Sequence, residues 1–220
     1  MLDLGLNLPG GRPPRLLFIG AHSDDIEIGC GGTIIQLLQR YPDAQVHWVV
    51  LSSEGNRGQE AKRAAQSLLA GVREPHITIK TFRGAYFPTE AAQIKDFFEE
   101  IKSGPPPDMV FSHCRDELHQ DHRIVGELTW NTFRDHVILE YEIPKYDGGL
   151  GSPSVFVPLS EAAVSRKIEL LMSAFETQYD KRWFTPETFL GLMRLRGIEC
   201  NAPEGYAEAF YSRKLVLGTV

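Results

Sequence analysis

One histidine and two aspartates stand within four consecutive positions near the beginning of the sequence, in His22-Ser23-Asp24-Asp25. They follow the apolar run 15–20, which is typical of a buried parallel strand. A charged cluster at the end of a buried strand is costly unless its charges are used or compensated. His22 and Asp25 could bind one metal ion, while Asp24, pointing another way, could remain free. The competing interpretation is a solvated loop whose aspartates cap the following helix, since aspartate is a favoured N-cap residue.

A second cluster, His119-Gln120-Asp121-His122, strengthens the metal interpretation. Together the two clusters supply the nitrogen and oxygen ligands that zinc accepts. Two histidines and one carboxylate around an open fourth position form a typical catalytic zinc site, whereas structural zinc is normally enclosed by four ligands, largely cysteine. Ferrous iron or cobalt would also accept such ligands. The pattern therefore predicts one catalytic metal ion, with zinc as the first choice, and a hydrolytic reaction.

The remaining polar groups match the needs of amide hydrolysis. Zinc lowers the pKa of its bound water to about 7. A nearby carboxylate can take the proton, and a protonated imidazole can stabilise the developing oxyanion. Once three ligands are assigned, Asp24 is left as the base and His119 as the acid or oxyanion stabiliser. Asp121 could orient His119 and favour its charged form.

These residues must be positioned by alternating strands and helices. Such alternation predicts an α/β fold, a Rossmann-like doubly wound and mostly parallel sheet with helices on both faces, in a single domain over residues 1–220. The functional site of such a sheet lies at the carboxyl ends of its strands, where both clusters fall. The predicted strands are 15–20, 45–52, 76–82, 108–113 and 137–142. The segment 29–40 is predicted to be a glycine-rich turn that leads into a helix, and further helices are predicted at 59–69, 91–102, 122–134 and 161–177.

The motifs resemble those of a known family. The segment Ala-His-Ser-Asp-Asp-Ile-Glu-Ile-Gly-Cys-Gly-Gly-Thr at 21–33, followed by His-Gln-Asp-His at 119–122, is similar to the LmbE-like (PIG-L) family of zinc-dependent N-deacetylases, and the segment 208–214 resembles the family's ending. Ser23 stands where proline is common, and Ile26 precedes the acidic position, here Glu27. Neither departure removes a proposed ligand.

The resemblance implies a Rossmann-like fold, one zinc ion and substrates that are mostly N-acetylglucosaminyl compounds. It also implies roles for individual residues, and these agree with the assignment from residue types. It implies that His22, Asp25 and His122 bind zinc, that Asp24 is the general base, and that His119 assists the tetrahedral intermediate with Asp121 behind it.

Three further positions have two interpretations each. Arg57 could contact a sugar hydroxyl or phosphate through its guanidinium, or could be a surface arginine beside a helix start. Asp116 could contact the sugar or brace the loop. Cys30 could be a nucleophile, but no base is assigned to it, which favours a small buried packing residue. The Gly- and Pro-rich region 141–158 is expected to shape the choice of substrate.

The composition of the sequence limits the classes of partner that we expect the protein to bind. With 23 basic and 29 acidic residues and no basic stripe, the sequence argues against nucleic-acid binding. No run of about 18 apolar residues and no export signal is visible, so no membrane span is expected. The three scattered cysteines indicate a reducing compartment, the cytoplasm. The expected partner is a small-molecule amino-sugar substrate, and a homo-oligomer is possible.

The leading hypothesis is a zinc-dependent hydrolase that removes an N-acetyl group from an N-acetylglucosamine-type sugar or glycoconjugate. The first alternative is an amidase acting on a larger glycosyl conjugate. The second is a catalytically silent sugar-binding module, which would have little reason to keep both the ligands and the base.

Overall fold

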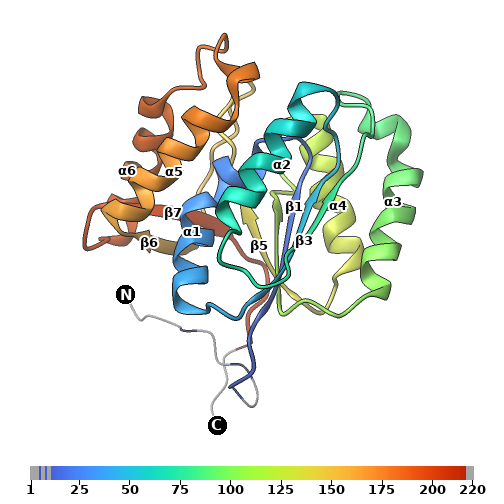
Figure 1. The fold of residues 1–220 in the computed structure, drawn as a ribbon, viewed down its shortest axis with the longest axis horizontal. Coiled ribbons are helices and arrows are strands. Elements are labelled where there is room, and N and C mark those ends of the chain that lie inside the picture. Colours follow the sequence, from blue (N-terminus) through green and yellow to red (C-terminus); the bar gives the residue numbers. More distant parts are fainter. Residues whose placement is uncertain (1–4, 6–7, 9–10, 217–220) are drawn as a thin grey trace.

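A seven-stranded sheet runs through the computed structural model, which describes residues 5, 8 and 11–216 (Figure 1). Its strand order is β3-β2-β1-β4-β5-β7-β6. Strands β1 to β5 are parallel, while β7 pairs antiparallel with both β5 and β6. The mostly parallel, Rossmann-like sheet is thus confirmed. The strands are β1 (Arg15–Gly20), β2 (Gln45–Val50), β3 (His76–Ile79), β4 (Met109–His113), β5 (Val137–Tyr141), β6 (Val155–Leu159) and β7 (Tyr206–Tyr211).

Helices cover both faces of this sheet (Figure 1). Strand β1 is apolar throughout because both of its faces are buried. Leu16 and Phe18 belong to the hydrophobic cluster that includes residues of α1, α2, α5 and α6. Leu17 and Ile19 belong to the cluster that includes residues of α3 and α4. The helices are α1 (Asp25–Arg40), α2 (Asn56–Leu68), α3 (Phe87–Ser103), α4 (Gln120–Thr132), α5 (Glu161–Ala174) and α6 (Pro186–Cys200), with a 3₁₀ turn, η2 (Glu176–Gln178).

The glycines after the first cluster lie inside a helix, which corrects the predicted turn at 29–32. Helix α1 already begins at Asp25, and it is kinked at Cys30. A Cβ on Gly29 would lie 2.3 Å from the Tyr141 ring, and one on Gly32 would lie 2.6 Å from Leu159. The glycines therefore allow α1 to approach β5 and β6 closely. Cys30 is fully buried, as its packing interpretation predicted.

The last third of the chain holds elements that were not predicted, namely β6, α6 and β7. Helix α6 has a weak helical pattern because it is apolar on two sides: Phe189 and Met193 are buried, whereas Leu195 and Ile198 are exposed. Several boundaries were also wrong: α2 begins at Asn56 rather than 59, and α3 begins at Phe87 rather than 91. Strand β3 ends at Ile79 rather than 82, and α5 ends at Ala174, before η2. Across the described residues, we find no helix with the length and apolarity needed to cross a membrane.

Candidate active site

The two predicted clusters meet at the carboxyl ends of β1 and β4. These strands are neighbours in the sheet, so the segments that leave them lie side by side. His22 lies in the bend between β1 and α1, and Asp25 is the first residue of α1. His119 is the N-cap of α4, and His122 lies in its first turn. The topology thus brings together residues about a hundred positions apart, as the strand-end rule predicts.

Three side chains converge on one point. His22 Nδ1 lies 3.1 Å from His122 Nε2 and 3.4 Å from Asp25 Oδ2, and His122 Nε2 lies 3.5 Å from Asp25 Oδ1. In a tetrahedral zinc site with bonds of about 2.0–2.1 Å, neighbouring ligand atoms are roughly 3.3–3.4 Å apart. The donor types of these three residues suit zinc, and their nearest atoms lie close to this spacing, with Asp25 presenting Oδ2 to His22 and Oδ1 to His122.

Each of these histidines has a carboxylate on its other ring nitrogen. Asp121 Oδ2 lies 3.1 Å from His22 Nε2, and Glu117 Oε2 lies 3.3 Å from His122 Nδ1. Histidine ligands commonly donate their second N–H to a carboxylate in this way. With both N–H groups so used, the lone pairs of His22 Nδ1 and His122 Nε2 face each other, an arrangement that a cation between them stabilises.

The charges around His22 favour a cation. Burial lowers the pKa of His22, but the carboxylates of Asp121 and Asp25 outweigh burial and raise this pKa to about 9. Burial likewise raises the pKa of Asp25, but His122 and His113 outweigh it and hold this pKa well below its usual range. The site therefore keeps Asp25 ionised and stabilises positive charge beside it.

His113, the last residue of β4, belongs to the site and was not singled out from the sequence. Its Nε2 lies 3.1 Å from Asp25 Oδ2 and accepts the Ala21 amide at 3.0 Å. Burial and the charge of His122 lower the pKa of His113 to about 4. It is therefore neutral and packs beneath Asp25. Within the described part of the chain, two overlapping groups could hold a metal ion, one of His22, His119 and His122 and one of Asp25, His113 and His122.

Asp24 is buried next to Asp25. It occupies the N-cap of α1, yet among the described residues its side chain caps no amide, so the capping interpretation is wrong. Arg57 Nη2 lies 3.3 Å from Asp24 Oδ1, and Arg57 Nε donates to Ser23 Oγ at 3.0 Å. Burial and the charge of Asp25 raise the pKa of Asp24, while Arg57 opposes this rise. A carboxylate tuned upward is suited to proton transfer near neutral pH.

The predicted contact between Asp121 and His119 does not form. The Asp121 carboxylate accepts the amides of Ala85 at 2.5 Å and Phe87 at 3.2 Å, in addition to contacting His22. Ala85 has a left-handed φ of 64°, a costly conformation that places its amide against this carboxylate. Residues two apart at a helix start do not face each other. Asp121 therefore orients His22, not His119.

His119 faces the ligand group without a partner for one ring nitrogen. Its ring centroid lies 5.1 Å from that of His22 and 4.5 Å from that of His122. Its Nδ1 is buried and, across residues 11–216, has no hydrogen-bond partner. Burial and the charge of His22 lower the pKa of His119. The imidazole is half-buried, which leaves it available to a bound substrate.

Glu117, rather than Asp116, braces the loop before α4. Its Oε1 accepts the Leu118 amide at 2.7 Å and pairs with Lys145 Nζ at 2.6 Å. Burial raises the pKa of Glu117, but His122 and Lys145 outweigh it and lower this pKa to about 2. Asp116 is exposed and lines a cavity of about 170 Å³ together with Glu117, Lys145 and Leu150. The loop-bracing role thus belongs to Glu117, and a sugar contact by Asp116 stays a prediction.

Replacing Glu117 by glutamine is expected to weaken metal binding about 10- to 100-fold, the usual effect of losing an outer carboxylate. The glutamine side-chain amide would favour the metal-binding tautomer of His122 less strongly than the carboxylate does, and it would not form an ion pair with Lys145. Competition with a chromophoric chelator measures the affinity. E140Q is the matched control, because Glu140 binds the Arg115 amide and Trp130 but no histidine ligand. Equal affinities for E117Q and the unmodified protein would contradict the assigned role.

Glu27, noted in the sequence only as the family's acidic position, is buried next to the site. It is 1% exposed, and neither carboxyl oxygen has a hydrogen-bond partner among the residues placed in the structure. Burial raises the pKa of Glu27 well above its usual range, and the charges of Asp24 and Asp25 raise it further. The native state therefore holds a proton on Glu27 that the unfolded chain releases above a pKa of about 4.3.

This raised pKa predicts that stability falls as pH rises, because the unfolded state loses the proton first. E27Q removes this titration. Its free energy of unfolding is expected to exceed that of the unmodified protein by about 1–3 kcal/mol at pH 7 and to differ little from it near pH 4.3. Urea unfolding of the metal-free proteins across this range tests it, with E74Q at an exposed site as control. Lower stability of E27Q at pH 7 would mean that Glu27 is ionised.

Comparison with known proteins agrees with this site. The family model described as PIG-L, GlcNAc-PI de-N-acetylase, matches residues 17–133, more than half of the chain and the part that carries both clusters. YaiS of Escherichia coli (strain K12), described as an uncharacterized deacetylase, is 29% identical over 160 residues, which cover 66% of this chain and 82% of YaiS.

Solved structures share the fold at low identity. The N,N'-diacetylchitobiose deacetylase of Pyrococcus horikoshii is 20% identical with a TM-score of 0.65, covering 91% of this chain and 84% of that chain. GalB, the 4-carboxy-2-hydroxymuconate hydratase of Pseudomonas putida KT2440, is 17% identical with a TM-score of 0.67, covering 94% of this chain and 99% of GalB. At these identities the likeness concerns the fold, which carries more than one kind of reaction.

Proposed function

Because the chain belongs to the PIG-L family, the family of GlcNAc-PI de-N-acetylases, we propose that it is a zinc-dependent hydrolase that removes an N-acetyl group from an N-acetylglucosamine-type sugar or glycoconjugate. One observation carries the proposal. The ligand atoms of His22, Asp25 and His122 converge at 3.1–3.5 Å, and the buried carboxylate of Asp24 lies beside them without being one of the three.

Each residue has a part in the reaction. His22, Asp25 and His122 would hold the ion, which when bound polarises the amide carbonyl and lowers the pKa of water. Asp24 accepts a proton from the attacking water as its oxygen bonds to the carbonyl carbon. His119 donates a hydrogen bond to the developing oxyanion. Asp24 then returns the proton to the leaving nitrogen as the C–N bond breaks, which yields acetate and a free amine.

Arg57 combines two tasks in this proposal. It holds Asp24 and Ser23 from the first turn of α2, and 36% of its side chain remains exposed. The exposed part of the guanidinium can bind sugar hydroxyls or a phosphate. We place Asp116 at the rim of the same site, where it lines the cavity beside Glu117. The partner is a small-molecule amino sugar, and the unpaired Cys30, Cys114 and Cys200 support a cytoplasmic location.

One observation favours a larger conjugate as the substrate. The cavity of about 170 Å³ beside Glu117 has Leu150 in its lining, and Leu150 is 48% exposed. Leu118, 54% exposed, lies in the loop between Glu117 and His119. An apolar rim and a hollow next to the ligands would suit a group attached to the sugar. The alternative activity is therefore the same hydrolysis on a larger glycosyl conjugate.

Acetate release from a panel of N-acetylglucosamine derivatives tests the function. Each derivative is incubated with the protein as purified, after chelation, and after zinc is restored. Release that follows the zinc would support the reaction, and its ranking over free sugar and larger conjugates would decide between the two substrates. Bound zinc without release from any derivative would contradict deacetylation and favour a silent sugar-binding module.

A further inference from the structure

Helix α1 consists of two segments that meet at a kink. Cys30, inside the helix, has φ −146° and ψ 19°, which is not a helical conformation. The segment before the kink is Asp25–Gly29, and it carries a predicted ligand directly after Asp24. A helical segment of one or two turns is unstable in isolation, because nucleation costs more than its few hydrogen bonds return. Tertiary contacts must therefore hold this segment.

Lys167 and Glu208 bind the backbone on both sides of the kink. In a regular helix the Gly32 amide would donate to the Ile28 carbonyl, four residues earlier. Here the Gly32 amide donates to Glu208 Oε1 at 2.9 Å, and the Ile28 carbonyl accepts from Lys167 Nζ at 2.6 Å. The Thr33 amide donates to Glu208 Oε2 at 2.6 Å. The two side chains therefore provide partners for backbone groups next to the break.

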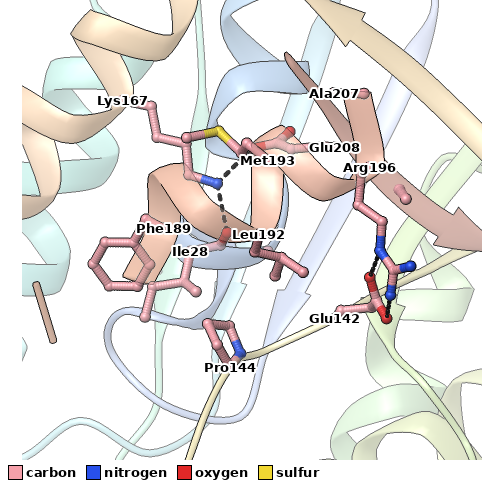
Figure 2. Close-up of a pocket in the computed structure, with 12 residues that line it drawn as sticks. Ile28, Glu142, Pro144, Lys167, Phe189, Leu192, Met193, Arg196, Ala207 and Glu208 are labelled. Carbon is pink, nitrogen blue, oxygen red and sulfur yellow. Dashed lines mark hydrogen bonds and ion pairs between the residues drawn. The ribbon is translucent and has the colours of Figure 1, made fainter. Parts of the chain in front are cut away.

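The pair lies inside the protein, and both partners also hydrogen-bond the α1 backbone. Lys167 comes from α5 and Glu208 from β7, each side chain is 3% exposed, and their closest atoms are 2.6 Å apart. Figure 2 shows the Lys167 ammonium between Glu208 and Ile28, with the Glu142–Arg196 pair lying apart along the same small cavity. A buried ion pair is tolerated when further hydrogen bonds satisfy both partners. The α1 backbone supplies those bonds here.

We propose that Lys167 and Glu208 are positioning residues for the metal site, an inference that rests on the function proposed above. They anchor the short first segment of α1 to α5 and β7. This anchoring holds Asp25 against His122, and Asp24 beside them, although neither Lys167 nor Glu208 touches the reacting atoms. Glu208 is the first residue of the segment 208–214, whose sequence resembles the family's ending. The proposed anchoring of α1 gives this residue a structural role.

Hydrogen exchange in the metal-free full-length protein tests the anchor without any need for activity. The first variant, E208Q, leaves the charge of Lys167 buried without a carboxylate partner and could therefore unfold the protein. The double variant K167M/E208Q removes both charges and is measured beside it. Exchange of the amides in 25–33 is expected to rise about tenfold in both variants. E142Q is the matched control, because the bonds of Glu142 go to Arg196, Gly151 and Tyr211. Unchanged exchange at 25–33 in K167M/E208Q would overturn the anchor.

Cobalt affinity tests the link to the metal site. K167M/E208Q is expected to bind cobalt about tenfold more weakly than the unmodified protein, the size of a typical outer-shell effect, while E142Q keeps its affinity. Faster exchange at 25–33 with unchanged cobalt affinity would show a structural ion pair only and would overturn the positioning role. If the unmodified protein binds neither cobalt nor zinc, the proposed function fails, and with it the role of the pair at a metal site.

Discussion

Replacing Asp24 by asparagine is expected to lower kcat about 10²- to 10⁴-fold, the range for loss of a general base. Metal content is expected to stay stoichiometric, because Asp24 is not among the three residues whose nearest ligand atoms lie 3.1–3.5 Å apart. Asparagine matches the shape of aspartate, can still contact Arg57, and cannot accept a proton at neutral pH. Acetate release at saturating substrate, together with metal analysis of the same sample, measures both quantities.

D43N provides the matched control for this change. Asp43 is exposed in the turn before β2, at the opposite edge of the sheet, so the same substitution there should leave kcat and metal content unaltered. Activity within a few-fold of the unmodified protein in D24N would assign the base to another residue. Loss of metal from D24N would instead make Asp24 part of the ligand set.

Replacing His122 by alanine is expected to abolish metal binding and, with it, turnover. The substitution removes one of the three proposed ligands, so the loss of affinity should exceed the 10- to 100-fold expected for the outer carboxylate Glu117. Glu117 and Asp25 also lose the imidazole that lies 3.3 Å and 3.5 Å from them. Metal analysis after dialysis against a weak chelator, followed by the acetate assay with excess zinc, measures the effect.

H136A is the control for His122→Ala. His136 precedes β5 at the other end of the sheet, where its neighbour Asp135 is exposed, so its loss should change neither metal content nor turnover. Retention of stoichiometric metal by H122A would contradict the assigned site, and also both groups of described residues that could otherwise hold an ion, because each of those groups contains His122. Folding of H122A is checked by its unfolding transition in the metal-free state.

The reaction depends on this site and not on the fold. A hydratase shares the architecture with a TM-score of 0.67, and a deacetylase shares it with one of 0.65. Site chemistry decides function where one fold carries many reactions. The variants of Asp24 and His122 therefore test the deacetylase proposal more directly than any structural likeness does.

Much of the site could be predicted from the sequence. The residue types of His22, Asp25 and His122 indicated a catalytic metal site, and buried apolar runs placed two clusters at strand ends. In a parallel sheet those ends share one edge, so local patterns were enough to predict that the clusters meet. The core of alternating strands and helices up to β5 was confirmed for the same reason, because periodic apolar patterns are local. A single domain over 1–220 and a homo-oligomer stay predictions.

The remaining features depend on side-chain direction and on distant segments, which only the tertiary structure decides. Asp121 contacts His22 rather than His119, because residues two apart at a helix start diverge. Glu117 contacts His122. Its neighbour Asp116 lies at nearly the same sequence distance from His122, so spacing alone could not decide which of the two acids makes this contact.

The antiparallel strands β6 and β7 and the pair Lys167 and Glu208 illustrate the long-range part. A lysine in an amphipathic helix and a glutamate near the end of the chain carry no local sign that they meet at a kink in α1. The sequence determined which residue types gather at the site and at which edge of the sheet they lie. Packing determined which carboxylate orients which histidine, because burial and long-range pairing set the partners of each charged group.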